Sequence, residues 1–334
     1  MSEKKPYCGC ADTGDKILTL GVDTSNYTTS LALVRGGTVI KNVRRLLPVR
    51  ENERGLRQSD ALFHHTKALP ELCEELFSCG NYEPEKLCAV GVSSKPRNTE
   101  NSYMPCFLAG ISFASAVSGA LKAPLFNFSH QQGHIEAAIY SSGIQKALSL
   151  SNEFISFHVS GGTTDIVLCS KKADGSIACE KIGGTTDLNA GQAIDRTGVM
   201  LGLRFPCGKE LDEMSCSSSA RFGKIKVSVE GLSCSVSGLE NKTKTMAAQG
   251  VPPCDIAAFL FEYLSCVLGA LTDNLKEKYS LLPVLFAGGV MSNTRIRKNL
   301  SKRANVFFAS PELSSDNACG TSLLAYNKFK AENM

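Results

Sequence analysis

The chain has 334 residues, 43% of them hydrophobic and 20% charged, and a formal net charge of +4. This length suits two domains or lobes, and the composition excludes a disordered or fibrous chain. The small charge does not by itself indicate a nucleic-acid partner, and no continuous apolar run approaches the roughly 18 residues of a membrane span, so we expect a cytoplasmic protein without membrane attachment.

The first 16 residues are charged and contain no apolar core, which predicts a disordered tail rather than a signal peptide. Cys8 and Cys10 in this tail form only a weak motif for a soft metal. The 14 cysteines of the chain are scattered, and none forms a C-x-x-C pair. Several lie in apolar segments, where a free thiol packs as a small hydrophobic group, so we expect a reducing compartment and no disulfide framework.

Two segments share the same pattern of an apolar strand, a polar turn and a second apolar strand. They are residues 17–34 and, about 135 residues later, residues 154–169. The turn of the second segment, at residues 160–163, is rich in hydroxyl groups and glycine. The repeat predicts two related β-meander lobes.

Between the repeats the pattern is typical of an α/β protein. We predict helices at residues 60–77 and 105–121 and a buried strand at residues 87–93, followed by a polar loop at 94–103. Pro70 is expected to kink or interrupt the first helix.

A strand around Phe126 and Phe128 leads into two histidines, His130 and His134, with Ser129 as a plausible helix N-cap. Their spacing of four places both imidazoles on one helix face, where they can bind one metal ion together with a carboxylate from elsewhere. The alternative is that one histidine caps the helix and the other is a buried, hydrogen-bonded polar group.

After the second repeat we predict helices at residues 190–203 and 256–279 and a polar loop at 231–244. A strand at residues 283–287 runs directly into Gly288 and Gly289 and a helix, a pattern that often contacts phosphate because free N–H groups point outward. Two basic clusters, at residues 44–57 and 295–303, are more typical of solvated faces than of RNA sites.

Together these elements predict an α/β protein with the two-lobed fold of sugar kinases, actin and the heat-shock chaperones (ASKHA), with duplicated β-meander lobes around a central cleft. The expected division is a tail at 1–16, lobe I at 17–129 and lobe II at 130–315. The C-terminal helix at 316–330 is a candidate to pack back onto lobe I.

The order of several short motifs resembles one family, the tRNA N6-adenosine threonylcarbamoyltransferases (TsaD), formerly described as O-sialoglycoprotein endopeptidases. The matching segments are residues 21–25, 130–134, 159–162, 189–203, 237–239, 288–293 and 315–317. The resemblance extends from about Leu18 to Phe329. Motifs in the correct order are far more specific than any one alone.

The chain also departs from the family pattern. The glycine-rich loop after the first-lobe strand is replaced by residues 94–98, which include Lys95 and Arg97. Thr163 stands where the family has a histidine, and Gln192 where it usually has glutamate. The P-G-G turn reads Pro-Cys-Gly at residues 206–208, and His158 replaces a small or apolar residue. A divergent paralogue is therefore an alternative.

The resemblance implies transfer of a threonylcarbamoyl group from its adenylate to N6 of the adenine beside the anticodon, in tRNAs that read codons beginning with A. It implies a divalent metal, Fe²⁺ or Zn²⁺, on His130, His134 and Asp316. It also implies threonylcarbamoyl-AMP as the nucleotide substrate and, as partners, tRNA and proteins of the same pathway, an ATPase and a dimerising paralogue.

Catalytic roles are expected at Asp23 and Ser160. Substrate contacts are expected at His158, Val159, Ser160, Gly161, Gly162, Asp195, Gly208, Asp212, Gly289, Asn293 and Arg97. Simpler roles stay open: Asp316 and Asn293 can each cap a helix, Asp195 can pair with its neighbour Arg196, and Arg97 can lie in a solvated loop. Two other functions also stay open, a non-catalytic scaffold in the same pathway and an ATP-dependent small-molecule kinase or carbamoyltransferase.

Overall fold

The computed structural model describes residues 15–25, 27–48, 56–78, 86–314 and 316–333, which fall into two compact units. Unit 1 comprises Met1–Tyr140, Lys171–Ala178 and Asp316–Met334, and unit 2 comprises Ser141–Ser170 and Cys179–Ser315. The sequence-based boundary at residue 129 differs from this division, because the histidine helix packs within unit 1. Residues 1–14 of the predicted tail lie outside the described residues. The prediction of a loose tail is wrong for Asp15, whose carboxylate accepts hydrogen bonds from Tyr326 (2.7 Å) and Lys330 (3.2 Å).

Unit 1 is built on a five-stranded sheet in the order β3-β2-β1-β4-β5. β1 and β2 are antiparallel, as are β2 and β3, whereas β1, β4 and β5 run parallel. Its strands are β1 (Leu18–Asp23), β2 (Thr28–Arg35), β3 (Thr38–Leu46), β4 (Leu87–Lys95) and β5 (Leu125–Ser129). Its helices are α1 (Gln58–Ser78), α2 (Phe107–Leu121), α3 (His130–Ser142) and α10 (Cys319–Asn333). Pro70 lies inside α1 without ending it.

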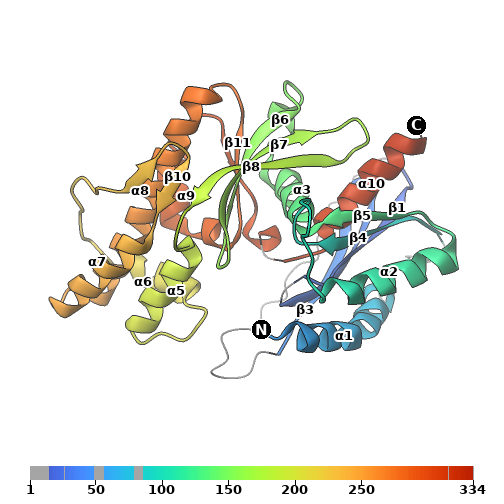
Figure 1. The fold of residues 1–334 in the computed structure, drawn as a ribbon, viewed down its shortest axis with the longest axis horizontal. Helices are drawn as coiled ribbons and strands as arrows, with labels where there is room; N and C mark the ends of the chain where they lie inside the picture. Colours follow the sequence, from blue (N-terminus) through green and yellow to red (C-terminus); the bar gives the residue numbers. More distant parts are fainter. Residues whose placement is uncertain (1–14, 26, 49–55, 79–85, 315, 334) are drawn as a thin grey trace. The chain divides into compact units, whose positions relative to one another are not determined.

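Helices cover both faces of this sheet (Figure 1). α1 and α2 pack on one face, where Leu20, Val22 and Val92 join the apolar core. α10 packs on the other face, where two strand residues are glycines. A Cβ on Gly21 would lie 2.6 Å from the amide nitrogen of Ser322, and one on Gly91 would lie 2.6 Å from the carbonyl oxygen of Thr321. The absence of side chains at these positions lets the backbone of α10 approach the sheet closely.

Unit 2 contains a seven-stranded sheet in the order β12-β11-β6-β7-β8-β10-β9. Its strands are β6 (Glu153–Val159), β7 (Thr164–Lys171), β8 (Ile177–Thr185), β9 (Ser228–Glu230), β10 (Ser233–Ser235), β11 (Val284–Ala287) and β12 (Val306–Phe308). Its helices are α4 (Gln145–Leu148), α5 (Ala190–Met200), α6 (Gly208–Cys216), α7 (Ser237–Ala248), α8 (Pro253–Lys278) and α9 (Thr294–Leu300), with short 3₁₀ helices η2 (Gly289–Ser292) and η3 (Pro311–Leu313).

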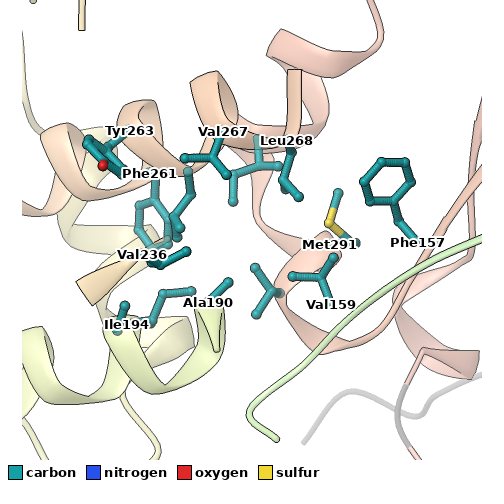
Figure 2. Close-up of a cluster of buried hydrophobic side chains, with 14 of the residues drawn as sticks. Phe157, Val159, Ala190, Ile194, Val236, Phe261, Tyr263, Val267, Leu268 and Met291 are labelled. Carbon is teal, nitrogen blue, oxygen red and sulfur yellow. The ribbon is translucent and has the colours of Figure 1, made fainter. Parts of the chain in front are cut away.

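The core of unit 2 lies between the sheet and α5, α7 and α8 (Figure 2). Phe157 and Val159 on β6 face Phe261 and Leu268 of α8 across this core, together with Met291. By length and composition α8 is apolar enough to cross a membrane, although acidic residues interrupt its apolar sequence. Of its most apolar window, 67% is buried inside unit 2, so it is the core helix of this unit.

One predicted segment is wrong. Residues 231–244, predicted as a loop because of their polar composition, contain β10 and most of α7. Asp187 stabilises the start of α7. Its carboxylate accepts hydrogen bonds from the backbone N–H groups of Val236 (2.9 Å) and Ser237 (3.2 Å). A cap supplied by a distant residue leaves no local signal in the sequence.

Candidate metal centre and nucleotide-binding residues

The end of β5 and the start of α3 hold the two histidines in place. The N–H of Gln132 donates to Ser129 Oγ at 3.2 Å, and the N–H of Ser129 donates to Gln132 Oε1 at 2.8 Å. This reciprocal cap begins the helix at His130, so His130 and His134 lie on one face, edge to face, with ring centroids 4.2 Å apart.

Asp316 of unit 1 approaches both imidazoles. Its Oδ1 lies 3.2 Å from His134 Nε2 and 3.7 Å from His130 Nε2. The helix cap that the sequence left open for Asp316 is made by its neighbour instead, because Asn317 Oδ1 accepts the N–H of Cys319 at 3.0 Å. Asp316 is thus not the residue that caps α10.

His130, His134 and Asp316 fit a divalent cation. One donor atom from each lies within 4.8 Å of the others. Tetrahedral ligands at about 2.1 Å from a metal are roughly 3.4 Å apart, and the two nitrogen–oxygen distances of 3.2 and 3.7 Å bracket that value. Two imidazole nitrogens and one carboxylate oxygen leave coordination positions for substrate, as a catalytic site requires.

Asp23 supports this group from the sheet. Its Oδ2 lies 2.8 Å from His130 Nδ1 and accepts the Ser93 hydroxyl at 2.7 Å, and its Oδ1 accepts the N–H of Ser25 at 2.8 Å. A carboxylate at Nδ1 holds the proton there and leaves Nε2 facing Asp316 for a metal. Asp23 is 1% exposed, so the geometry favours a positioning role instead of the catalytic one expected from the sequence.

The charges of this group are strongly coupled. Burial alone would lower the pKa of His130, but the charge and hydrogen bond of Asp23 raise it to about 9. Burial alone would likewise raise the pKa of Asp23 and of Asp316, but His130 lowers the first, and the hydrogen bond from His134 and the charge on His130 lower the second. Both carboxylates therefore stay ionised, which suits binding of a cation, and a metal ion would displace the Nε2 proton that a pKa of about 9 leaves on His130 at neutral pH.

The hydroxyl groups of Ser93 and Thr321, which were not predicted from the sequence, complete this network. Ser93 Oγ lies 3.1 Å from Thr321 Oγ1 as well as donating to Asp23. Ser93 ends the buried part of β4 and Thr321 lies on α10, so these hydroxyls meet only after the parallel strands and α10 have packed. Neither lies in a motif that marks it in the sequence.

The loop that replaces the family's glycine-rich segment lies at the start of α3. The carbonyl oxygen of Pro96 accepts the N–H of Gln131 at 3.1 Å, and the N–H of Arg97 donates to Ser102 Oγ at 2.9 Å. Lys95 and Arg97 are half-buried rather than fully solvated. Two positive side chains thus belong to a loop that is hydrogen-bonded beside His130.

In unit 2, three segments meet at the end of β6. The turn after β6 is closed by a hydrogen bond from Ser160 N–H to the Thr163 carbonyl at 2.8 Å, and Gly191 N–H donates to the Ser160 carbonyl at 3.2 Å. Gly288 has a φ of +99°, and a Cβ there would overlap the backbone of Val159. The 160–163 turn, the start of α5 and the Gly288–Gly289 turn therefore pack together, while the Val159 side chain lies in the core (Figure 2).

The expected nucleotide contacts fall into two separate groups of hydrogen bonds. Asp195 Oδ1 accepts the N–H of Cys207, next to Gly208, at 2.9 Å. Asp212 Oδ1 accepts from Asn293 Nδ2 at 2.7 Å, and Asn293 Oδ1 caps α9 by accepting the N–H of Ile296 at 2.9 Å. Asn293 therefore makes the predicted cap, and Asp212 orients it. Asp195 is half-buried, and this burial raises its pKa although the hydrogen bond from Cys207 lowers it. His158 lies on β6 directly opposite Asp165 of β7.

Four glycines among the expected nucleotide contacts face open space. A Cβ added to Gly161, Gly162, Gly208 or Gly289 would have no heavy atom within 4 Å. Packing within the chain therefore does not explain glycine at these positions, in contrast to Gly191 and Gly288. Glycine at such positions permits a ligand to approach the backbone closely.

Three of the five basic residues in the second cluster make structural contacts. Arg297 donates to the Ala309 carbonyl at 2.9 Å, Arg295 donates to the Ser215 carbonyl at 3.0 Å, and Arg303 pairs with Asp273 at 2.8 Å. The contacts of Arg295 and Arg297 anchor α9, and that of Arg303 ties the segment after α9 to α8. Residues 50 and 54 of the first cluster lie outside the described residues.

Comparison with solved structures shows the fold. Component A of (R)-2-hydroxyglutaryl-CoA dehydratase from Acidaminococcus fermentans matches 94% of this chain and 100% of its own, with a TM-score of 0.55 and 16% identity. A ROK family glucokinase from Streptomyces griseus matches 92% of this chain and 99% of its own, with a TM-score of 0.51 and 13% identity. The predicted two-lobed α/β (ASKHA) fold class is confirmed.

Comparison of sequences shows the family. The tRNA N6-adenosine threonylcarbamoyltransferase of Fervidobacterium nodosum is 29% identical over 94% of both chains, and that of Prosthecochloris aestuarii is 28% identical over 93% of this chain and 94% of its own. The family model TsaD, tRNA N6-adenosine threonylcarbamoyltransferase, matches residues 48–322. That range contains both histidines, Asp316 and every expected nucleotide contact, and the chain belongs to the TsaD family.

Proposed function

We propose that this protein transfers the threonylcarbamoyl group from threonylcarbamoyl-AMP to N6 of the adenine beside the anticodon in tRNAs that read codons beginning with A. The observation that carries this proposal is the arrangement of His130, His134 and Asp316 around one point in a chain of the TsaD family. The amine of adenine attacks the carbamoyl carbon, the bond from that carbon to the AMP oxygen breaks, and the amine loses a proton.

The residues of unit 1 suit the metal that this family implies. A divalent cation on His130, His134 and Asp316, with Fe²⁺ favoured over Zn²⁺, would stabilise negative charge on substrate oxygens. Asp23 holds the proton on His130 Nδ1 and keeps Nε2 directed at the metal position. This assignment makes Asp23 and Ser93 positioning residues.

The residues of unit 2 suit the adenylate. The backbone N–H groups of Gly161 and Gly162 would hold phosphate or carbamoyl oxygens, while the N–H of Ser160 closes the turn on the Thr163 carbonyl. The carboxylate of Asp195 or Asp212 would accept ribose hydroxyls, with Gly208, Gly289 and Asn293 beside the nucleotide. Asp195 is the better candidate, because both carboxylate oxygens of Asp212 already accept hydrogen bonds from Asn293 and Thr294.

The open glycines give a test of the nucleotide position. Gly208→Ala places a methyl group in space that the chain leaves empty, so folding is expected to be unaffected. AMP binding is expected to weaken roughly tenfold, about 1.4 kcal/mol, in isothermal calorimetry. Gly223→Ala, also in open space but outside the expected site, is the control. Wild-type affinity in Gly208→Ala would place the nucleotide elsewhere.

Arg97 is proposed to bind the anionic substrate or the tRNA backbone. Removal of a charge-assisted contact in Arg97→Ala is expected to raise the KM for tRNA or for the adenylate at low salt. The difference from wild type should shrink as salt rises, because ions screen a phosphate contact. Lys278→Ala, an exposed lysine at the end of α8, is the control. Identical kinetics of Arg97→Ala and wild type at low salt would show that the loop is merely solvated.

The decisive test of the activity uses protein purified without oxygen and reconstituted with Fe²⁺ or Zn²⁺. Unmodified tRNA and threonylcarbamoyl-AMP are supplied, with and without the ATPase and dimerising partner proteins of the pathway. Formation of threonylcarbamoyladenosine, measured by mass spectrometry of digested tRNA, is the expected result. No product under any of these conditions, from protein that binds metal and AMP, would favour a non-catalytic role or another substrate.

A further inference from the structure

Two cysteines face each other across the hairpin of β7 and β8, which are neighbours in the sheet. At the closed end, the N–H of Lys172 donates to the Ser176 carbonyl at 2.9 Å. At the open end, a Cβ on Gly184 would overlap the carbonyl oxygen of Thr164. Lys172 is therefore paired with Ser176, and Thr164 with Gly184. Both pairs belong to one antiparallel register, in which Cys169 lies directly opposite Cys179.

The type of pair suits a disulfide. Hydrogen-bonded and non-hydrogen-bonded pairs alternate along an antiparallel ladder, and Lys172 and Ser176 form a hydrogen-bonded pair, so Cys169 and Cys179 form a non-hydrogen-bonded pair. The Cα atoms of such a pair are about 4.5 Å apart, within the span of about 4.4–6.8 Å that a disulfide bridges. The thiol of Cys179 is also near enough to Cys169 to help raise its pKa.

The two thiols differ in environment. Cys169 is fully buried, and Phe154 of β6 lies opposite it on its other side. Cys179 is half-buried and therefore within reach of a small reagent. Burial, together with Cys179, raises the pKa of Cys169 well above its usual range, so the more accessible Cys179 is the thiol that reacts first.

We propose that Cys169 and Cys179 are a site of reversible oxidation to an intramolecular disulfide by a low-molecular-weight disulfide such as glutathione disulfide. Cys179 attacks one sulfur of the reagent, breaks its S–S bond and releases one glutathione, which takes up the Cys179 proton. Cys169 then attacks the Cys179 sulfur, loses its own proton and releases the second glutathione. The protein loses two electrons and two protons, and the reagent gains them.

The cross-link would act on a strand that leads from the proposed nucleotide turn. β7 begins at Thr164, directly after the 160–163 turn, and the disulfide would tie β7 covalently to β8 at mid-strand. The inference is independent of the proposed transferase activity, because it concerns only the chemistry of the two thiols.

Trypsin separates the two cysteines, which makes the test direct. Cleavage after Lys146, Lys171, Lys172 and Lys181 yields peptides 147–171 and 173–181, each with a single cysteine. The folded protein is incubated with glutathione disulfide, alkylated and digested. Mass spectrometry is expected to detect the two peptides joined, two hydrogens lighter than their sum, in about tenfold excess over any other disulfide. Dithiothreitol should release them, and the oxidised protein should unfold at a higher temperature than the reduced protein.

Three variants complete the experiment. Cys169→Ala and Cys179→Ser should each abolish the cross-link and the rise in unfolding temperature. Cys179→Ser removes only a half-buried thiol, so this variant is expected to fold. Cys88→Ala, at a half-buried cysteine of unit 1, should leave both unchanged. A glutathione adduct on Cys179 that never resolves, or a cross-link that forms only in denaturant, would overturn the proposal.

Discussion

Replacement of His134 by alanine is expected to remove the bound divalent metal and abolish transferase activity while the protein stays folded. In the proposed site His134 is one of three ligands among the residues that the structure describes, and its Nε2 lies 3.2 Å from Asp316 Oδ1. Loss of one ligand from such a set removes most of the binding free energy. Metal content by plasma mass spectrometry after anaerobic reconstitution is the primary measurement, with circular dichroism to verify the fold. His130→Ala and Asp316→Ala should behave alike.

Two further variants make this prediction specific. His64→Ala, at a half-buried histidine of α1 outside the group, should bind metal as the wild type does. Asp23→Asn keeps a hydrogen-bonding side chain at His130 Nδ1 but loses its charge, so metal affinity is expected to fall by roughly 10–100-fold rather than vanish. Full metal occupancy in a His130→Ala, His134→Ala double variant would refute the assignment.

Substitution of Gly320 by alanine is expected to be the most destabilising single change in unit 1. A Cβ at this position of α10 would overlap the carbonyl oxygen of Gly133 on α3 and lie 2.8 Å from the amide nitrogen of Ala137. Both obstacles are backbone atoms, which cannot rotate away as a side chain can. The two helices must separate, at an expected loss of about 3 kcal/mol or more in the free energy of unfolding. The unfolding temperature should fall by roughly 6–12 °C.

The same change should also disturb the metal centre, because Gly133 immediately precedes His134. Metal affinity measured below the unfolding temperature is therefore expected to decrease together with stability. Gly119→Ala is the control: it lies in α2, its Cβ would meet nothing within 4 Å, and alanine should add up to ~1 kcal/mol of helix stability. A Gly320→Ala protein as stable as the wild type would show that α3 and α10 do not cross this closely.

The sequence by itself determined the class of the protein. Alternation of apolar residues and the repeated strand–turn–strand pattern predicted the paired β-meanders, because side-chain periodicity follows directly from backbone geometry. Short motifs in a fixed order predicted the family. The spacing of His130 and His134 placed two imidazoles on one helix face, since residues four apart are neighbours on any α-helix.

Only the tertiary structure decided how these residues work together. The contact of Asp23 with His130, the Ser93–Thr321 pair behind it and the approach of Asp316 join parts of the chain that are distant in sequence. The same holds for Asp187, which supports α7 although residues 231–244 are polar enough to resemble a loop. Contacts of this kind arise when strands pair and helices pack, and the free energy of that packing depends on the whole fold. Local composition and spacing therefore do not predict which distant residue a carboxylate will contact.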